Sequence, residues 1–266
     1  MALPLIVSES QAGKRVRSHL KDVAEKFGID LRSENIHALQ GRPFEEICRL
    51  ARERSIDLII TATRGNTGLK HLVLGSTAER IVRYSPCPVL VVHVADRKQS
   101  GGRNRASRPA LRIKKILVPI DFSDSSMKGL AYAKGLAKKF DAALVLLHSV
   151  HVQYFATNTD YAQADLPLLM QEVEKASREQ MPALVQKTDW EGVKVEASLQ
   201  TGHPGDQICV QAKHHRADLI VTSTHGTTGL KHVLLGSTAE YVVRHAHIPV
   251  LVVPSHDRPV LTSSKK

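Results

Sequence analysis

Residues 224–244 read THGTTGLKHVLLGSTAEYVVR, and residues 63–83 read TRGNTGLKHLVLGSTAERIVR. Fifteen of these 21 positions are identical, at a constant offset of 161 residues. The match continues beyond both stretches, since Pro88-Val-Leu-Val-Val92 answers Pro249-Val-Leu-Val-Val253. A repeat of this period indicates a duplicated domain, because solenoid units span only about 20–50 residues.

The second copy, taken as residues 113–255, alternates short apolar runs with stretches of helical periodicity. This alternation is typical of βαβ units, and right-handed crossovers then give a doubly wound parallel sheet. The sequence therefore predicts an α/β fold. We expect strands at 115–120, 142–147, 193–199, 219–222 and 250–253, and helices at 127–140, 166–185, 206–214 and 237–245.

The first copy, taken as residues 1–95, is incomplete at its beginning when it is compared with the second. Counted back by the offset, residues 1–30 correspond to about 162–191, so nothing in the first copy matches Lys115–Val150. Two interpretations stay open. Either the natural start lies upstream of Met1, or this copy is degenerate and supports the second.

The segment between the copies, residues 96–112, is basic, and a short tail, residues 256–266, follows the second copy. Eight Lys and Arg residues fall between Asp96 and Lys115, and they supply most of the net charge of +11. This composition is typical of a flexible linker. A basic linker can contact phosphate backbones. However, no aromatic residue is interleaved with it for base stacking, so nucleic acid is not the expected partner.

Several functional classes are disfavoured by the composition. No apolar run approaches the roughly 18–20 residues that span a bilayer. The three cysteines, Cys48, Cys87 and Cys209, form no closely spaced pair, and an odd, sparse count fits a reducing compartment. We therefore expect a cytoplasmic protein with these thiols buried. The histidine pairs lack the Cys or carboxylate partners of a metal site, and no catalytic constellation stands out, so neither a metal nor a dedicated active site is expected.

The chemistry is concentrated in the loop that follows the strand expected at 219–222. This loop runs from Ser223 through Gly226 to Gly236, and the next helix is predicted to begin at Ser237 with a Ser237–Glu240 capping box. A glycine before a helix start lets the backbone approach a phosphate, which the helix N-terminus attracts. Open α/β sheets also bind ligands at the carboxyl ends of their strands. The alternative is that the glycines only shape a turn and Ser237 only caps the helix.

With these residues the sequence resembles the universal stress protein family across nearly the whole chain, in a tandem form with a truncated first copy. That family carries G-x2-G-x9-G-[ST] in this loop, with ATP phosphates on it. Here the motif reads Ser223-x2-Gly226-x9-Gly236-Ser237 and Ala62-x2-Gly65-x9-Gly75-Ser76, so a small residue replaces the first glycine in both copies. The family's first strand ends in an Asp near the nucleotide, which matches Asp121, and its second strand offers backbone groups to adenine near Ser149.

The resemblance implies the adenine-nucleotide α-hydrolase-like fold, with strand order 3-2-1-4-5, and a nucleotide site in the second copy. The expected ligand is ATP, with AMP or ADP as alternatives and Mg²⁺ held only through the nucleotide. The expected function is the regulation of a stress response. A ligand-free pairing module and a slow ATP hydrolase are the alternatives. The residues expected to bind are Pro119, Ile120, Asp121, Ser149, Thr222, Ser223, His225, Gly226, Gly236, Ser237 and Thr238, with weaker first-copy equivalents at Ala62, Gly65, Gly75, Ser76 and Thr77.

The last strand of each copy is expected to join the two halves. In the order 3-2-1-4-5, Val89–Val92 and Val250–Val253 are edge strands, and an open apolar edge promotes aggregation. The family pairs these strands antiparallel across a dimer. The resemblance therefore implies an intramolecular pseudo-dimer with Val91 and Val252 near its axis. Whether the chain also forms a homo-oligomer stays open.

Overall fold

The computed structural model describes residues 11–29, 32, 35–63, 74–93, 112–151, 166–226 and 235–255. The chain divides into two compact units, Met1–Ile47 and Cys48–Lys266. The first unit contains α1 (Gln11–Lys26) and the start of α2 (Pro43–Glu53). The tail and all of the expected linker except Arg112 lie outside the described residues.

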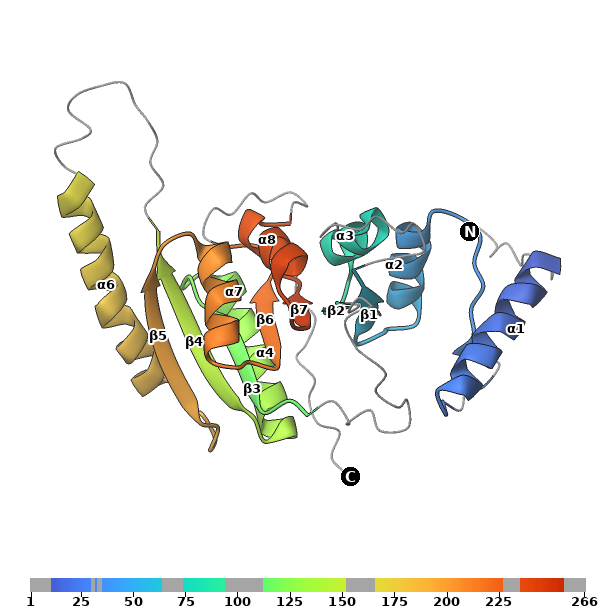
Figure 1. Ribbon diagram of the computed structural model, residues 1–266, viewed down its shortest axis with the longest axis horizontal. Coiled ribbons are helices and arrows are strands. Elements are labelled where there is room, and N and C mark those ends of the chain that lie inside the picture. Colours follow the sequence, from blue (N-terminus) through green and yellow to red (C-terminus); the bar gives the residue numbers. More distant parts are fainter. Residues whose placement is uncertain are drawn as a thin grey trace, which may run out of the picture. The chain divides into compact units, whose positions relative to one another are not determined.

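A seven-stranded sheet runs through the second unit in the order β1-β2-β7-β6-β3-β4-β5 (Figure 1). Neighbouring strands are parallel except for β2 and β7, which are antiparallel. The five strands of the second copy stand in the order 3-2-1-4-5, which confirms the predicted doubly wound sheet. The strands are β1 (Ile59–Ala62), β2 (Val89–Val92), β3 (Lys115–Pro119), β4 (Ala143–Val150), β5 (Val195–Thr201), β6 (Leu219–Ser223) and β7 (Val250–Val253).

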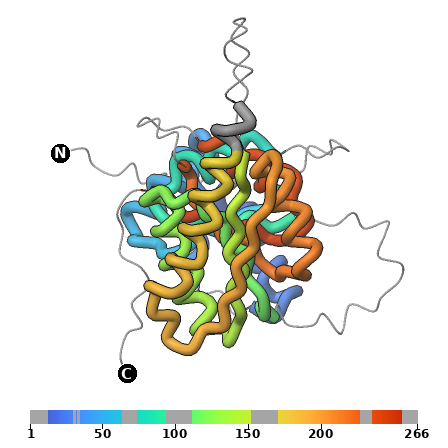
Figure 2. The backbone as a smooth tube through the Cα atoms, turned by 90° about the vertical axis from the view of Figure 1, so that its left-hand side faces the viewer, coloured from blue at the N-terminus to red at the C-terminus, as the bar shows by residue number. Residues whose placement is uncertain are grey.

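Helices cover both faces of the second copy's strands. On one face lie α4 (Asp124–Phe140) and α6 (Leu166–Lys187), and on the other lie α7 (Pro204–His214) and α8 (Ser237–His245). Figure 2 views the sheet from its β5 edge, with α6 and α7 on opposite sides. Sequence patterns located these elements, but α7 begins two residues earlier than expected and β4 ends three residues later, at Val150.

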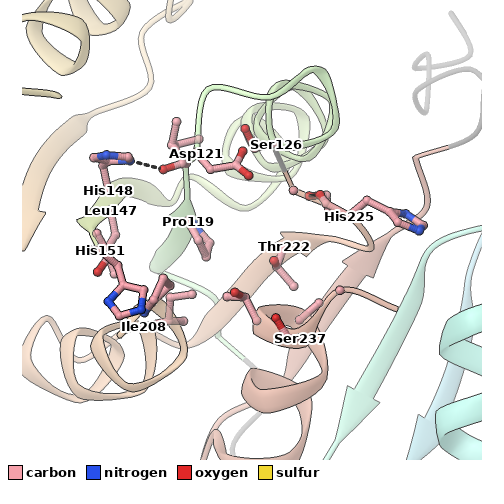
Figure 3. A pocket seen from close by; sticks show the side chains of 18 of the residues that line it. Pro119, Asp121, Ser126, Leu147, His148, His151, Ile208, Thr222, His225 and Ser237 are labelled. Carbon is pink, nitrogen blue, oxygen red and sulfur yellow. Dashed lines mark hydrogen bonds between the residues drawn. The ribbon is translucent and has the colours of Figure 1, made fainter. Parts of the chain in front are cut away.

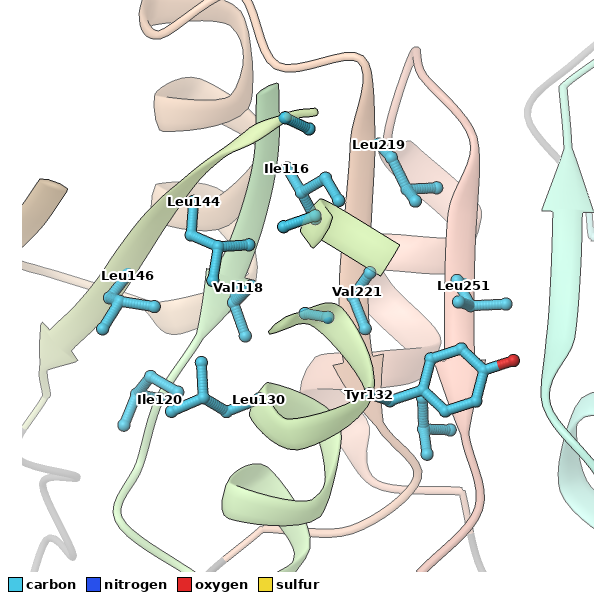
Figure 4. Packing of buried hydrophobic residues seen from close by; sticks show 14 of the residues in the cluster. Ile116, Val118, Ile120, Leu130, Tyr132, Leu144, Leu146, Leu219, Val221 and Leu251 are labelled. Carbon is cyan, nitrogen blue, oxygen red and sulfur yellow. The ribbon is translucent and has the colours of Figure 1, made fainter. Parts of the chain in front are cut away.

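The main hydrophobic core lies between the sheet and α4. Leu130 and Tyr132 of α4 pack over Ile116 of β3, Val221 of β6 and Leu251 of β7 (Figure 4). Burying a large aliphatic side chain of this kind stabilises the fold by about 1.5–3 kcal/mol. The core is mainly aliphatic because the chain has few aromatic residues, and α4 packs closely on the sheet. Gly129 of α4, for example, lets the helix approach the backbone of Ser223 on β6.

The repeat seen in the sequence is reproduced in the elements. The helices α2 and α7, the helices α3 (Ser76–Tyr84) and α8, and the strands β2 and β7 have equal lengths within each pair and start 161 residues apart. The agreement ends near the beginning of the first copy. Residues 35–40, which correspond to part of β5, form no strand in the part of the chain that the structure describes.

The antiparallel ladder between β2 and β7 pairs Val89 with Val252, Leu90 with Leu251, and Val91 with Val250. Leu90 and Leu251 are equivalent in the repeat, so the local two-fold axis passes between them. Val91 and Val252, which were expected near the axis, each lie one residue from it. All four valines are at most 1% exposed, so this junction is as well buried as the core.

Replacing Val252 with proline should destabilise the protein by about 3 kcal/mol or more. The carbonyl groups of Pro249 and Val253 accept hydrogen bonds from the β6 side. Because peptide groups alternate along a strand, the N–H of Val252 points toward β2. Proline at this position would remove that N–H. The Val252→Ala control keeps this N–H and should cost about 2 kcal/mol, from the lost methyl groups and the cavity. Urea unfolding of both variants measures the difference. Equal losses in the two variants would show that the ladder adds nothing beyond side-chain packing.

Candidate functional site

A cavity of about 480 Å³ opens at the carboxyl ends of β3, β4 and β6, beside the first turns of α7 and α8 (Figure 3). The structure brings all eleven second-copy residues expected from the sequence to this cavity. They are Pro119, Ile120, Asp121, Ser149, Thr222, Ser223, His225, Gly226, Gly236, Ser237 and Thr238. The three strand ends converge here because β3, β4 and β6 are parallel neighbours, and the starts of α7 and α8 lie beside them.

The N-terminus of α8 forms one wall of the cavity. Gly236 is the N-cap, with φ −60° and ψ 144°, and no side chain caps the described helix start. The predicted capping box is therefore wrong. Ser237 is already helical, and the Glu240 carboxylate accepts from Arg244 at 2.7 Å instead of reaching back to the N-cap. The first N–H groups of an α-helix have no partner within the helix, so this wall presents backbone donors and the positive end of the helix dipole.

The turn between β3 and α4 forms the opposite wall (Figure 3). Asp121 Oδ1 accepts from the N–H of Ser123 at 3.0 Å and from its hydroxyl at 2.6 Å. Between them, Phe122 adopts a left-handed conformation with φ 61°, which is uncommon for a bulky residue. Ser123 also caps α4 by accepting from the N–H of Ser126. The carboxylate is thus held rigidly by a tight turn.

Glycine is required where the β6 loop passes the Asp121 side chain. A Cβ atom added to Gly226 would lie 2.5 Å from Asp121 Oδ2, so any larger residue would displace the carboxylate. A Cβ atom on Gly236 would lie 3.1 Å from the carbonyl oxygen of Thr224. The N–H of Gly236 donates to that same oxygen at 2.7 Å, which holds the start of α8 against the end of β6.

His148 connects this region to α6. Its Nδ1 lies 2.7 Å from the carbonyl oxygen of Ile120, and because a carbonyl only accepts, Nδ1 carries the proton. Its Nε2 lies 3.1 Å from the hydroxyl oxygen of Ser177 on α6. The imidazole ring also contacts the ring of Phe122, with 4.9 Å between centroids. His148 therefore joins the end of β3, the β3–α4 turn and α6.

The end of β4 offers backbone groups to the cavity. The carbonyl of Leu147 accepts from Ile120, and that of Val150 accepts from Gly202 beyond β5. The alternation of a strand then directs the peptide groups of Ser149 to the same side as those of Leu147. The strand on that side, β3, ends at Pro119, which pairs with Leu147, so it does not reach Ser149. The Ser149 hydroxyl donates to the carbonyl of Gly202 at 2.8 Å, which fixes this end of the strand.

The loop after β6 is held by its own polar side chains. The hydroxyl of Ser223 donates to the carbonyl of His225 at 2.8 Å. The imidazole Nδ1 of His225 lies 2.9 Å from Thr224 Oγ1 and 3.0 Å from Ser255 Oγ. The ring of His225 therefore turns toward Ser255, and this residue borders the cavity mainly through its backbone.

The first-copy equivalents are only partly described. Gly75 is the N-cap of α3 with nearly the same dihedral angles as Gly236, φ −60° and ψ 139°, and its N–H donates to the carbonyl of Thr63 at 2.9 Å. Ser76 and Thr77 begin α3, and Ala62 ends β1. Gly65 lies outside the described residues. The described part of the first copy contains no counterparts of β3 and β4, so nothing there corresponds to Asp121 or Ser149.

Sequence reasoning missed ten lining residues, of two kinds. Some are apolar or small residues on segments that already contained a predicted site residue. They could have been found by including the neighbouring positions on those segments. Others, His148, His151 and Val173, contribute through tertiary packing that no spacing signals. The ten are Ser126, Leu147, His148, Val150, His151, Val173, Pro204, Ile208, Thr224 and Ala239.

Three further observations concern the cysteines, metal-binding groups and the helices. Burial raises the pKa of the Cys48 thiol, and it raises that of Cys209 to about 11. Cys48 and Cys87 are buried and Cys209 is partly buried, and none of them forms a disulfide. Within the described ranges, no three His, Cys, Asp or Glu residues are placed to share a metal ion. Among the same residues, none of the helices has the length and apolar character needed to cross a bilayer.

The chain is similar to known proteins in both sequence and structure. A universal stress protein of Methanocaldococcus jannaschii is 36% identical over 140 residues, covering 53% of this chain and 81% of that protein. One from a Synechocystis species is 28% identical over 243 residues, covering 91% of this chain and 71% of the relative. A solved universal stress protein from Archaeoglobus fulgidus superposes with a TM-score of 0.63 over 96% of this chain and 84% of its own, at 24% identity, and so shares the fold.

The model of the universal stress protein family matches two stretches of the sequence, residues 3–93 and 112–254. Together these stretches cover most of the chain, and each contains one copy of the repeat. The chain therefore belongs to the universal stress protein family.

Proposed function

We propose that this protein binds one adenine nucleotide, ATP or its products ADP and AMP, in the cavity of the second copy, and that this binding regulates a stress response. One observation carries the proposal. The N-terminus of α8, which no side chain of the described residues caps, faces a cavity that also holds Asp121 and the backbone edge of Ser149. These three features match the phosphates, the ribose and the base of a nucleotide.

The phosphates belong at α8. Gly236 has no side chain to keep a ligand away, and the N–H groups of Ser237 and Thr238 begin the helix. Backbone donors and a positive helix end are a recurring phosphate site. The hydroxyl groups of Ser237 and Thr238 add two further donors. Mg²⁺ would enter with the phosphates, since Asp121 is the only carboxylate among the described residues that line the cavity.

The ribose belongs at Asp121. A carboxylate repels phosphate and accepts hydrogen bonds from hydroxyl groups, so it suits the sugar and not the phosphate chain. The hydrogen bonds from Ser123 hold Asp121 on the wall opposite α8. The separation between carboxylate and helix start therefore orients the nucleotide along the carboxyl edge of the sheet.

The base belongs beside β4. The peptide groups of Ser149 offer one donor and one acceptor, which is the pairing that the N1 and N6 edge of adenine requires. Apolar side chains of Val150, Val173 and Ile208 also line the cavity and suit the faces of a purine. Ligand sites are commonly apolar with a few placed polar groups.

The first copy would act as a structural partner and not as a second site. It has the glycine and the helix start at Gly75–Ser76, but its described part lacks the strands that carry Asp121 and Ser149 in the second copy. The β2–β7 ladder supports the interpretation of the chain as an intramolecular pseudo-dimer, in which the first copy occupies the edge that would otherwise be open.

Titration calorimetry of the full chain with ATP should give one site per chain. Gly236→Val should abolish this binding, because a branched side chain would occupy the phosphate position. Gly75→Val is the matched control, since Gly75 is an N-cap with nearly the same dihedral angles and its Cβ would meet the carbonyl of Thr63 at 3.3 Å. It should have a similar effect on stability and leave ATP affinity unchanged. Two equivalent sites, or equal losses of affinity in both variants, would contradict the proposal.

Asp121→Asn should weaken ATP binding by about tenfold or more, because a hydrogen bond to a charged group contributes about 1.5–3 kcal/mol. Asparagine keeps an oxygen that can accept from Ser123, so the turn should survive, which far-UV circular dichroism checks. The matched ligand is 2′,3′-dideoxy-ATP, which lacks the ribose hydroxyl groups and should bind the variant and the parent chain equally well. If the substitution reduced the affinity for both ligands by the same factor, Asp121 would not contact the ribose.

A further inference from the structure

The parallel ladder between β3 and β4 ends one hydrogen bond earlier than its geometry allows. The N–H of Ile120 donates to the carbonyl of Leu147 at 2.8 Å. In a regular parallel ladder the next bond would run back from the N–H of Ser149 to the carbonyl of Ile120. The last pair of the described ladder is Pro119 with Leu147, so this next bond is not formed. The carbonyl of Ile120 therefore needs another donor.

The imidazole ring of His148 supplies that donor. Its Nδ1 donates to the carbonyl oxygen of Ile120 at 2.7 Å (Figure 3). Its Nε2 lies 3.1 Å from the hydroxyl oxygen of Ser177, which also lies 2.8 Å from the carbonyl oxygen of Val173. The hydroxyl has one proton, so it donates to Nε2 of a neutral ring or to Val173 when the ring is cationic. Nδ1 carries a proton in both states, so the bond to Ile120 does not depend on the charge of the ring.

Packing fixes the ring of His148 in this orientation. On one side it contacts the ring of Phe122 in the β3–α4 turn, with 4.9 Å between the centroids. On the other side it meets Ser177 of α6, which is only 5% exposed. A side chain that is held by its neighbours presents its donor without further ordering. The bond to Ile120 is therefore a built-in part of the sheet end.

The consequence concerns the N–H of Ser149. Alternation directs the N–H and the carbonyl of Ser149 to the side on which Leu147 pairs with β3, and Ser149 lines the cavity. This donor and acceptor together match the N1 acceptor and the N6 donor of adenine. If the carbonyl of Ile120 accepted from Ser149, the donor would be used within the sheet and only the acceptor would remain for a base.

We propose that His148 determines the selectivity of the site for adenine, because it occupies the carbonyl of Ile120 and so keeps the N–H of Ser149 available to the base. This inference rests on the proposed nucleotide site and adds a positioning residue to it, since His148 acts through Ser149. Hypoxanthine is the informative comparison. Its N1 is a donor and its O6 is an acceptor, so each would face a like group of Ser149.

The test is calorimetry of the full chain with ATP and with inosine triphosphate. The parent chain should prefer ATP by about tenfold or more, because the inosine nucleotide leaves polar groups of the site unpaired. His148→Leu removes the donor, and Ser177 can still donate to Val173, so the fold should persist and the preference for ATP should disappear. His148→Asn should recover most of the preference, because its amide nitrogen lies as many bonds from Cβ as Nδ1 does. His214→Leu, the same substitution at the exposed end of α7, should leave the preference unchanged.

Amide hydrogen exchange of the ligand-free chain separates this inference from the proposed function. In the parent chain the N–H of Ser149 should exchange much faster than that of Leu147, which lies within the ladder. His148→Leu should slow the exchange of Ser149 about tenfold or more, and His148→Asn should not. Equally slow exchange of both amides in the parent chain would overturn the inference, and so would an ATP preference that survives His148→Leu. A parent chain that shows this exchange pattern but binds neither nucleotide would contradict the proposed function and still support the role of His148 at Ile120.

Discussion

The antiparallel ladder between β2 and β7 is the interaction on which the rest of the structure depends. Strands β1 and β2 have four residues each, and a two-stranded sheet of that size is not stable in water by itself. Joined to β7, they extend the five-stranded sheet of the second copy instead. The ladder also buries Val250 and Val252, which would otherwise form an open apolar edge.

This ladder gives the two copies unequal positions. The second copy has all five strands, and its helices cover both faces of the sheet, so its carboxyl edge can form a cavity with a rigid carboxylate on one wall and a helix start on the other. The first copy keeps the helix start at Gly75 but has no described strand beyond β1. The same glycine motif is thus present in both copies, and the two copies differ in the strands that surround it. The proposed site therefore depends on the strands beside the motif as much as on the motif itself.

Most of the fold and most of the candidate site could be predicted from the sequence. The repeat located equivalent elements, and apolar periodicity placed β7 and α8 at their observed residues. The site residues were predictable because the loop motif and the strand ends fix where backbone groups must converge. The capping box was mispredicted because local spacing cannot tell an N-cap from a first helical residue. Glu240 instead pairs with Arg244 one turn later, at the spacing favoured for ion pairs. His148 was missed because its contacts to Ile120 and Ser177 join segments that are distant in sequence.

The most direct test of nucleotide binding by the second copy alone is backbone amide NMR of the labelled protein during an ATP titration. The start of α8 and the start of α3 have nearly identical geometry, so each reports on its own copy under the same conditions. The amide resonances of Ser237 and Thr238 should shift with saturation at one equivalent of ATP, and those of Ser76 and Thr77 should stay in place. Shifts of both pairs, or of neither, would contradict the assignment of the site to the second copy.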